Sequence, residues 1–218
     1  MTSERAAWLA QTTEDPIDPD LPICDPHHHL WDRPDSRYML DELLEDIGGG
    51  HRITETVFVE CSSMYRKEGP ENTRPVGETE FVNGIAAQSA SGNYGDTKVA
   101  AGIVGYADLT LGDRVTEVLE SHIETSRNRF RGIRQSSCWD ESPDIGSYKN
   151  PPRGLLGDPK FRMGFSSLEK LGLSFDAWLF HTQLLELVDL ARAFPNVPII
   201  FDHIAGPLGI GPYAGRRE

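Results

Sequence analysis

Apolar and polar positions along the chain alternate between short apolar segments and longer stretches of helical periodicity. Six short segments predict β-strands, at residues 22–32 (a strand that runs into a loop), 56–60, 98–106, 130–134, 173–180 and 197–202. Four stretches predict helices, at residues 78–90, 113–127, 161–171 and 182–194. Short, largely apolar strands that alternate with helices are typical of a parallel sheet covered by helices. The pattern therefore predicts an α/β fold, and both a doubly wound sheet and a (β/α)₈ barrel fit it.

Two of the predicted helices carry clear end and face signals. Asp113 is the predicted N-cap of the helix at 113–127. The helix at 182–194 ends before Pro195, because proline cannot continue a helix. The predicted buried face of this second helix consists of Leu184, Leu187, Val188, Ala191 and Phe194.

Composition divides the chain into an arm and one domain. Residues 1–20 are polar and contain the segment DPIDPD, which predicts an extended N-terminal arm. Residues 21–218 are predicted to form a single domain. The stretches 62–76 and 140–157 contain proline and glycine and are predicted loops. Substrate specificity is expected to depend on these two loops.

The charge of the chain excludes some classes of partner. The 218 residues carry a formal net charge of −13 at pH 7. Such an acidic chain is a poor candidate for general binding to nucleic acid or to anionic membranes. No apolar run approaches the roughly 20 residues of a membrane span, and the first residues lack a basic segment followed by an apolar one. We therefore expect a cytoplasmic protein.

The cysteines give no sign of a disulfide framework. Cys24, Cys61 and Cys138 are widely spaced, and the chain contains no Cys-x-x-Cys motif. The same count and spacing do not predict a cysteine-rich zinc site. All three are expected to be reduced thiols.

A histidine triplet in the first strand is the strongest local chemical signal. Residues two apart on a strand point to the same side, so His27 and His29 project together and His28 points away. Two neutral imidazoles in this arrangement can bind one metal ion or polarise one carbonyl. Surface histidines at a polar strand end are the alternative.

Further candidates lie at the carboxyl ends of later strands, where sites of parallel α/β proteins assemble. His203 follows the sixth strand and is expected to share a pocket with His27 and His29. Arg134 ends the fourth strand and could clamp a substrate carboxylate; a structural ion pair is the alternative. His181 follows the fifth strand and could line the pocket or start a helix. In addition, Glu60, at the end of the second strand, is a candidate for supporting the site. His51 is interpreted as a loop residue and His122 as a residue on a helix surface, neither with a functional role.

Several segments resemble a known family. They are ICDPHHHLWD, FRGIRQ, GLLGDPKFRMGF and LGLSFDAWLFHTQLLELVDLARAFPNVPIIFDHIAGPLGIGPYAGRRE. These segments are similar to the amidohydrolase superfamily, and in particular to its amidohydrolase-related (amidohydrolase 2) group of TIM-barrel hydrolases, which contains pyrone-dicarboxylate and sugar lactonases. The Asp-x-His-x-His start and the later Asp-His-x-x-Gly-Pro are specific as a pair.

The resemblance implies a (β/α)₈ barrel with the site at the carboxyl ends of its strands. His27 and His29 resemble the family's first-strand pair, His203 its sixth-strand histidine, and Arg134 a contact to a substrate anion. The implied reaction is opening of a lactone or similar ester, with a lactone or a carboxylated ring as small-molecule substrate. The three histidines would polarise the carbonyl or hold one divalent metal such as zinc, although lactonases of this group also work without a metal. The alternatives are an inactive barrel fragment, a small-molecule binding module or a decarboxylase of the same superfamily.

The number of βα units departs from the family pattern. Six of the eight expected units precede Glu218, and the family's water-activating aspartate belongs to the eighth strand. Asp202 does not match that aspartate by position. We therefore expect 21–218 to form an incomplete barrel with impaired catalysis. Its first and sixth strands would have open edges, which predicts a homo-oligomer.

Overall fold

The computed structural model describes residues 7–8, 10–12, 14–126 and 128–216. Part of the predicted arm at 1–20 and the last residue of the predicted helix at 113–127 lie outside these ranges. The six predicted strands are β1 (Pro22–His28), β4 (Arg52–Val59), β5 (Lys98–Gly105), β6 (Phe130–Arg134), β7 (Ser174–Ala177) and β8 (Ile199–Phe201). They form one parallel sheet in the order β1-β4-β5-β6-β7-β8. This confirms the α/β prediction, and the sequential order excludes the doubly wound alternative, in which the strand order reverses.

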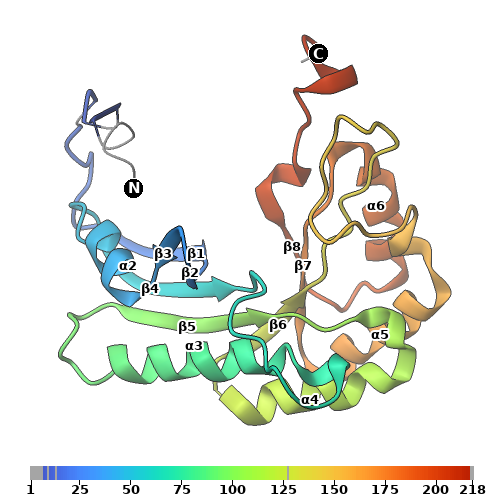
Figure 1. Ribbon diagram of the computed structural model, residues 1–218, viewed down its shortest axis with the longest axis horizontal. Coiled ribbons are helices and arrows are strands. Elements are labelled where there is room, and N and C mark those ends of the chain that lie inside the picture. Colours follow the sequence, from blue (N-terminus) through green and yellow to red (C-terminus); the bar gives the residue numbers. More distant parts are fainter. Residues whose placement is uncertain (1–6, 9, 13, 127, 217–218) are drawn as a thin grey trace.

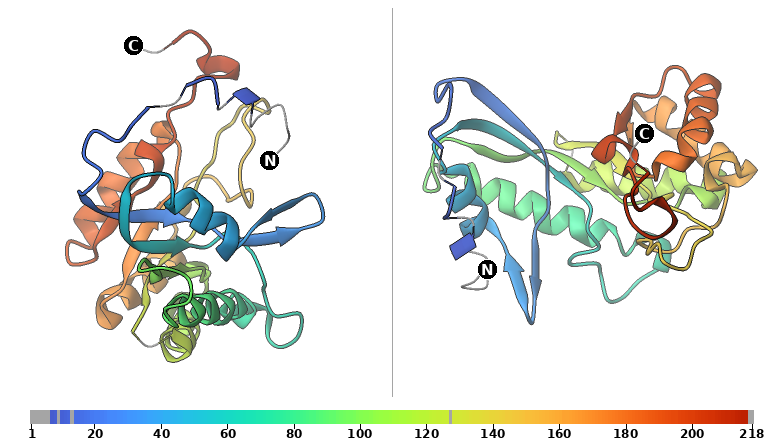
Figure 2. Two further views of the ribbon diagram at one scale, coloured as in Figure 1. Left: turned by 90° about the vertical axis from the view of Figure 1, so that its left-hand side faces the viewer. Right: turned by 90° about the horizontal axis from the view of Figure 1, so that it is seen from above.

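Helices cover the outer face of this sheet, and the sheet curls around its inner face (Figure 1; Figure 2). In Figure 1, α3 (Val76–Ser89) and α4 (Val115–Ser126) lie below the strands, whereas α5 (Pro159–Leu171) and α6 (Leu184–Ala193) lie at the right. None of the helices in the described residues is long and apolar enough to cross a membrane. The curled, sequentially ordered sheet is an incomplete barrel, and the carboxyl ends of all six strands share one edge.

A small subdomain between β1 and β4 was not predicted. It consists of the hairpin β2 (Trp31–Arg33) and β3 (Ser36–Tyr38) followed by α2 (Leu40–Ile47). The Trp31 indole stacks on Tyr38 at 5.4 Å between ring centroids and donates a hydrogen bond to Ser36 Oγ at 2.9 Å. Such a short hairpin depends on one aromatic pair across the strands and carries no periodic signal along the sequence.

The predicted cap of α4 was wrong. Asp113 lies within a 3₁₀ turn, Leu109–Arg114, that leads directly into the helix at Val115. Asp108 caps that turn instead, and its carboxylate accepts a hydrogen bond from the Thr110 amide at 2.9 Å. The signal for a cap was present in the sequence but lay five residues earlier than expected.

The ends of α5 follow the rules of capping closely. The Asp158 carboxylate accepts hydrogen bonds from the amides of Lys160 and Phe161 at 2.8 and 2.9 Å, and Pro159 occupies the first turn. The helix therefore starts two residues before the predicted position. Gly172, with a φ of 65°, ends it in the left-handed conformation that glycine adopts without strain.

The predicted buried face of α6 is only partly buried. Leu187 is buried in the core, but Leu184 and Val188 are 38% and 40% exposed. The neighbouring edge strand β8 has Ile200 and Phe201 48% and 44% exposed. Within the described residues β8 pairs only with β7. Apolar surface is therefore open at this edge of the sheet, as the incomplete barrel predicts, and the oligomeric state stays a prediction.

Candidate functional site

The three histidines at the end of β1, with His29 directly after the strand, are separated as the alternation of side chains predicts. His28 is buried, its ring contacts Phe58, and its Nε2 lies 2.9 Å from Thr56 Oγ1. Burial lowers the pKa of His28 to about 4. His27 and His29 lie together on the other side, with 5.0 Å between ring centroids. The core therefore holds His28 as a neutral structural residue, and the other two remain available to a site.

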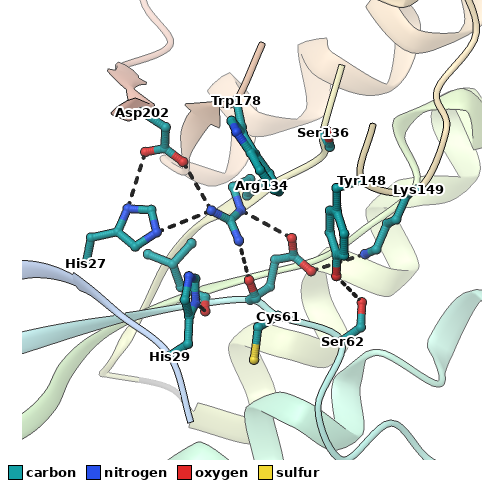
Figure 3. Close-up of polar contacts among 12 residues, drawn as sticks. His27, His29, Cys61, Ser62, Arg134, Ser136, Tyr148, Lys149, Trp178 and Asp202 are labelled. Atoms are coloured by element: carbon teal, nitrogen blue, oxygen red, sulfur yellow. Dashed lines mark hydrogen bonds and ion pairs between the residues drawn. The ribbon is translucent and has the colours of Figure 1, made fainter. Parts of the chain in front are cut away.

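The two ends of the curled sheet bring His27 and His203 together (Figure 3 shows the His27 side). Their ring centroids are 4.9 Å apart, although β1 and β8 are the outermost strands of the sheet. Asp202 is buried beside them, with its Oδ1 3.7 Å from His27 Nδ1. One donor atom from each of these three residues lies within 4.8 Å of the others. We call His27, Asp202 and His203 the polar triad.

The compact donor group differs in one member from the predicted metal set of His27, His29 and His203, which stays a prediction. His29 was expected to join His27 and His203, but within the described residues the third member of the compact donor group is Asp202. The Asp-His pair that follows β8 is the signal that could have identified Asp202. Asp202 does not match the position of the family's water-activating aspartate, so it was not expected to act as that base. A role as a metal ligand or as a positioning group is compatible with its position.

His29 has a defined tautomer. Its Nδ1 lies 2.7 Å from the Val59 carbonyl oxygen, so Nδ1 carries the proton and donates the hydrogen bond. The lone pair is then on Nε2. Burial lowers the pKa of His29 to about 4, and the nearby charge of Arg134 contributes to the lowering. His29 is therefore a neutral imidazole with a free Nε2 near neutral pH.

Arg134 is enclosed by its partners rather than exposed to a ligand. It is 2% exposed, and its guanidinium stacks over the Trp178 ring at 4.8 Å. It donates to Glu60 Oε1 at 3.2 Å, to His27 Nε2 at 3.2 Å and to Asp202 Oδ2 at 3.4 Å (Figure 3). Because arginine can only donate, His27 Nε2 must accept, and the proton of neutral His27 is on Nδ1, toward Asp202. The structure thus places Arg134 in the ion-pair role that was the alternative for it.

Glu60 connects the polar triad to a loop. This carboxylate is fully buried; its Oε1 accepts from Arg134 and its Oε2 lies 3.1 Å from Lys149 Nζ. Glu60 was expected to support the site, whereas Lys149 was missed because it lies in the predicted loop at 140–157. The chain of charges Asp202–Arg134–Glu60–Lys149 contains two anions and two cations, so the buried charges compensate one another.

His181 takes part in a different set of contacts. It begins the 3₁₀ helix His181–Gln183, its Nδ1 accepts a hydrogen bond from the Leu208 amide at 3.3 Å, and its ring lies edge-on to Tyr213 at 5.2 Å. These contacts hold the glycine-rich segment at 206–215 against the domain. His122 is also fully buried, between Thr79 and the Tyr106 carbonyl, so its interpretation as a helix-surface residue was wrong.

Two aspartates at the site have opposite pKa shifts. Burial and the charge of Asp202 raise the pKa of Asp176 to about 7, and its Oδ1 has no hydrogen-bond partner among the described residues. Burial also acts to raise the pKa of Asp202, but its hydrogen bond to His27 and the charges of His27 and Arg134 hold that pKa below its usual value. Asp202 is therefore an anion at neutral pH, and Asp176 retains its proton to much higher pH than an ordinary aspartate.

Asp176→Asn is expected to stabilise the protein at alkaline pH. Because the pKa of Asp176 is about 7 in the folded state, against an ordinary 3.8, its contribution to stability is complete below pH 3.8 and is lost as the pH rises through about 7. Asparagine avoids this loss, so its free energy of unfolding at pH 8 should exceed the wild-type value by about 1–3 kcal/mol. Urea unfolding at pH 4 and pH 8 measures the difference. Asp35→Asn, an exposed carboxylate in the β2–β3 turn, is the control, and equal effects of the two substitutions at pH 8 would contradict the assignment.

Comparison with known proteins gives a family match over most of the chain. The amidohydrolase family profile matches residues 24–215. The uncharacterised protein y4mH of Sinorhizobium fredii is 33% identical over 198 residues, which cover 84% of this chain and 62% of that protein. The L-fucono-1,5-lactonase of Burkholderia ambifaria is 26% identical over 166 residues, which cover 72% of this chain and 51% of the lactonase. The chain thus spans roughly half to two thirds of the length of these relatives.

Solved structures share the fold. An amidohydrolase from Burkholderia multivorans with bound zinc aligns with a TM-score of 0.56 at 18% identity, covering 84% of this chain and 58% of that one. A putative 2-pyrone-4,6-dicarboxylic acid hydrolase from Pseudomonas putida aligns with a TM-score of 0.53 at 17% identity, covering 88% of this chain and 62% of that one. At these identities the likeness concerns the fold, which confirms the partial barrel.

Proposed function

Because the chain belongs to the amidohydrolase family, as its two histidine motifs predicted, we propose that it opens a lactone or similar cyclic ester by attack of water. The observation that carries this proposal is the convergence of His27, Asp202 and His203 from the two outermost strands of the sheet. The lactonase among its relatives supports a lactone as substrate. The chain spans only part of the length of those relatives, so lactone hydrolysis by this chain is a proposal.

We propose that His203 acts on the carbonyl oxygen of the substrate. Its side chain is exposed, whereas Asp202 is buried behind it. Burial and the charge of His27 lower the pKa of His203, so it is a neutral imidazole with one N–H to donate near neutral pH. A hydrogen bond from that N–H would stabilise the negative charge that develops on the carbonyl oxygen. Asp202 and Arg134 act on His27 and fix its orientation.

The attacking water requires a proton acceptor, and His29 offers one. Its Nδ1 is held by the Val59 carbonyl, which leaves the Nε2 lone pair free to accept. The water oxygen forms a bond to the carbonyl carbon while its proton passes to His29 Nε2. The ring C–O bond then breaks, and the proton moves from His29 to the leaving ring oxygen. The product is an open-chain hydroxy acid, and His29 returns to its neutral form.

The polar triad also fits a metal ion in its chemistry. Two imidazole nitrogens and one carboxylate oxygen are ligands that zinc accepts, and their donor atoms lie within 4.8 Å of one another. His27, Asp202 and His203 would hold one divalent ion, with His27 binding through Nδ1; the proton of His27 would then lie on Nε2, and the hydrogen bond from Arg134 would be lost. Such an ion would polarise the substrate carbonyl as a Lewis acid. The zinc-bound amidohydrolase of Burkholderia multivorans supports this possibility. His29, outside the donor group, keeps its free Nε2 in either case.

Acid release from a panel of lactones tests the proposal. The panel contains L-fucono-1,5-lactone, aldonolactones and 2-pyrone-4,6-dicarboxylate, each followed with a pH indicator in the presence of EDTA or of added zinc. We expect at least one lactone to open well above its rate in buffer. Binding of panel members without turnover in either condition would favour the alternative of a binding module, and release of carbon dioxide without ring opening would favour a decarboxylase.

A further inference from the structure

The two loops that were expected to determine substrate specificity meet at the carboxyl edge of the sheet. Ser62 Oγ, from the loop at 62–76, and Tyr148 OH, from the loop at 140–157, are 2.5 Å apart (Figure 3). We call residues 147–150 the strap, because they link the loop after β6 to the loop after β4. The strap lies at the same edge of the sheet as the polar triad.

The ammonium group of Lys149 is surrounded by three aromatic rings and one carboxylate. It lies 3.6 Å from the centroid of the Tyr106 ring and 3.1 Å from Glu60 Oε2. The rings of Tyr148 and Tyr65 lie at 5.1 and 5.8 Å. Ring faces within about 6 Å attract a cation, and buried Glu60 adds a charge-assisted contact. These contacts hold the strap at a defined position.

Tyr148 and Lys149 contact the two groups that hold Arg134. The Tyr148 ring packs on the Trp178 ring at 5.2 Å between centroids, and the Arg134 guanidinium lies over the same indole at 4.8 Å. Lys149 contacts Glu60 Oε2, and Arg134 Nε donates to Glu60 Oε1 at 3.2 Å. Two neighbouring residues of the strap therefore reach Arg134, one through an aromatic ring and the other through a carboxylate.

Occupation of Glu60 Oε2 by Lys149 bears on the direction in which Arg134 points. Arginine favours a bidentate pair, in which two parallel N–H groups donate to the two oxygens of one carboxylate. Here Lys149 takes one oxygen of Glu60. Arg134 binds the other oxygen through Nε, and its Nη1 donates to His27 Nε2 at 3.2 Å. Without Lys149, a bidentate pair would pull the guanidinium toward Glu60 and lengthen its hydrogen bond to His27.

We propose that Tyr148 and Lys149 are positioning residues for the polar triad. They hold the guanidinium of Arg134 at His27 and thereby keep the His27 proton on Nδ1. The catalytic part of this inference rests on the proposed function, since the reaction at the polar triad is what requires an oriented His27. The strap is thus part of the site, and turnover depends on its docking.

The tautomer of His27 tests the positioning without any substrate. Two-bond ¹H–¹⁵N NMR spectra of the imidazoles, recorded at pH 8 with EDTA, distinguish Nδ1–H from Nε2–H, and the His27 signals are those absent from His27→Gln. The wild-type protein is expected to carry the proton on Nδ1. In Lys149→Met the ratio of Nε2–H to Nδ1–H should rise about tenfold, because the hydrogen bond from the charged guanidinium is weakened. In Lys149→Arg the ratio should stay within about twofold of wild type, since arginine can also contact Glu60 Oε2 and Tyr106.

A second variant and a matched control accompany this measurement. Tyr148→Leu removes the ring that packs on Trp178 and leaves both cations of Glu60 in place, so it keeps the test decisive if Lys149→Met folds poorly. Its tautomer ratio should rise about threefold. Arg153→Met is the control, because Arg153 belongs to the same loop and stacks on Trp139 at 5.1 Å. Its ratio should equal that of wild type.

Turnover separates this inference from the proposed function. For the best lactone of the panel, Lys149→Met should lower kcat about tenfold and leave KM within about threefold, and Lys149→Arg should restore kcat. If the wild-type protein opens no lactone, the proposed function fails, and the tautomer ratios still decide the positioning. A wild-type ratio in both Lys149→Met and Tyr148→Leu would overturn the proposal, as would an equal rise of the ratio in Arg153→Met.

Discussion

Arg134→Met is expected to lower the free energy of unfolding by about 3–5 kcal/mol. The guanidinium is 2% exposed and lies between two buried carboxylates, Glu60 and Asp202. Methionine preserves much of the packing against Trp178 but removes every hydrogen bond that the guanidinium donates. Among the described residues, the Glu60 carboxylate then retains only Lys149 as a partner. Removal of one member of a buried charge network costs far more than the net contribution of the network.

Urea unfolding at pH 7 measures this loss. Arg153→Met, which removes an arginine stacked on Trp139, is the control and should change the free energy of unfolding by less than about 0.5 kcal/mol. The double variant Arg134→Met, Glu60→Gln should recover part of the stability, because the buried negative charge is then absent as well. A loss below about 1 kcal/mol for Arg134→Met would show that the charges are not coupled as the distances indicate.

His203→Ala is expected to reduce kcat/KM for lactone opening by about 10²–10⁴-fold. In the proposed reaction this residue acts on the carbonyl oxygen, whether it donates a hydrogen bond or helps to hold an ion. Its backbone has a φ of 50°, in the left-handed region, so alanine also adds some strain. Ile204 has a φ of 54° and is exposed, which makes Ile204→Ala a control for truncation of a side chain in the same left-handed turn.

The control should keep turnover within about threefold of wild type, because Ile204 is exposed and supplies no donor atom to the polar triad. Equal losses in the two variants would assign the effect to the backbone of this turn. Full activity of His203→Ala would show that His203 has no role in the reaction.

Periodicity predicted the strands and helices that bury whole faces. β6 appears at its predicted residues, 130–134, and all of its residues except Arg131 are buried. The β2–β3 hairpin was missed because it depends on one contact, the Trp31–Tyr38 stack, which no periodic pattern reveals. The helix α2 was missed although its sequence carries the signal, since Leu40, Leu43, Leu44 and Ile47 recur at helical spacing and pack toward the core.

Only those residues of the candidate site that strand geometry places could be predicted. Alternation along β1 placed His27 and His29 on one side, and the parallel sheet placed His203 at the same edge. The burial of Arg134 could not be predicted, since it depends on the placement of Glu60 and Asp202 from distant segments. Lys149 could not be predicted for a related reason. It lies in a loop of irregular conformation, and its own backbone is left-handed, with a φ of 61°.

Ring opening in ¹⁸O-labelled water is the most direct test of the central claim, that the polar triad and His29 open a lactone by water attack. Mass spectrometry of the product formed from the best lactone of the panel would follow the label. The account predicts one ¹⁸O in the new carboxylate of each product molecule, formed at a rate that falls to near the buffer rate in His203→Ala. Labelled product that forms at the same rate with wild type, with His203→Ala and in buffer alone would contradict it.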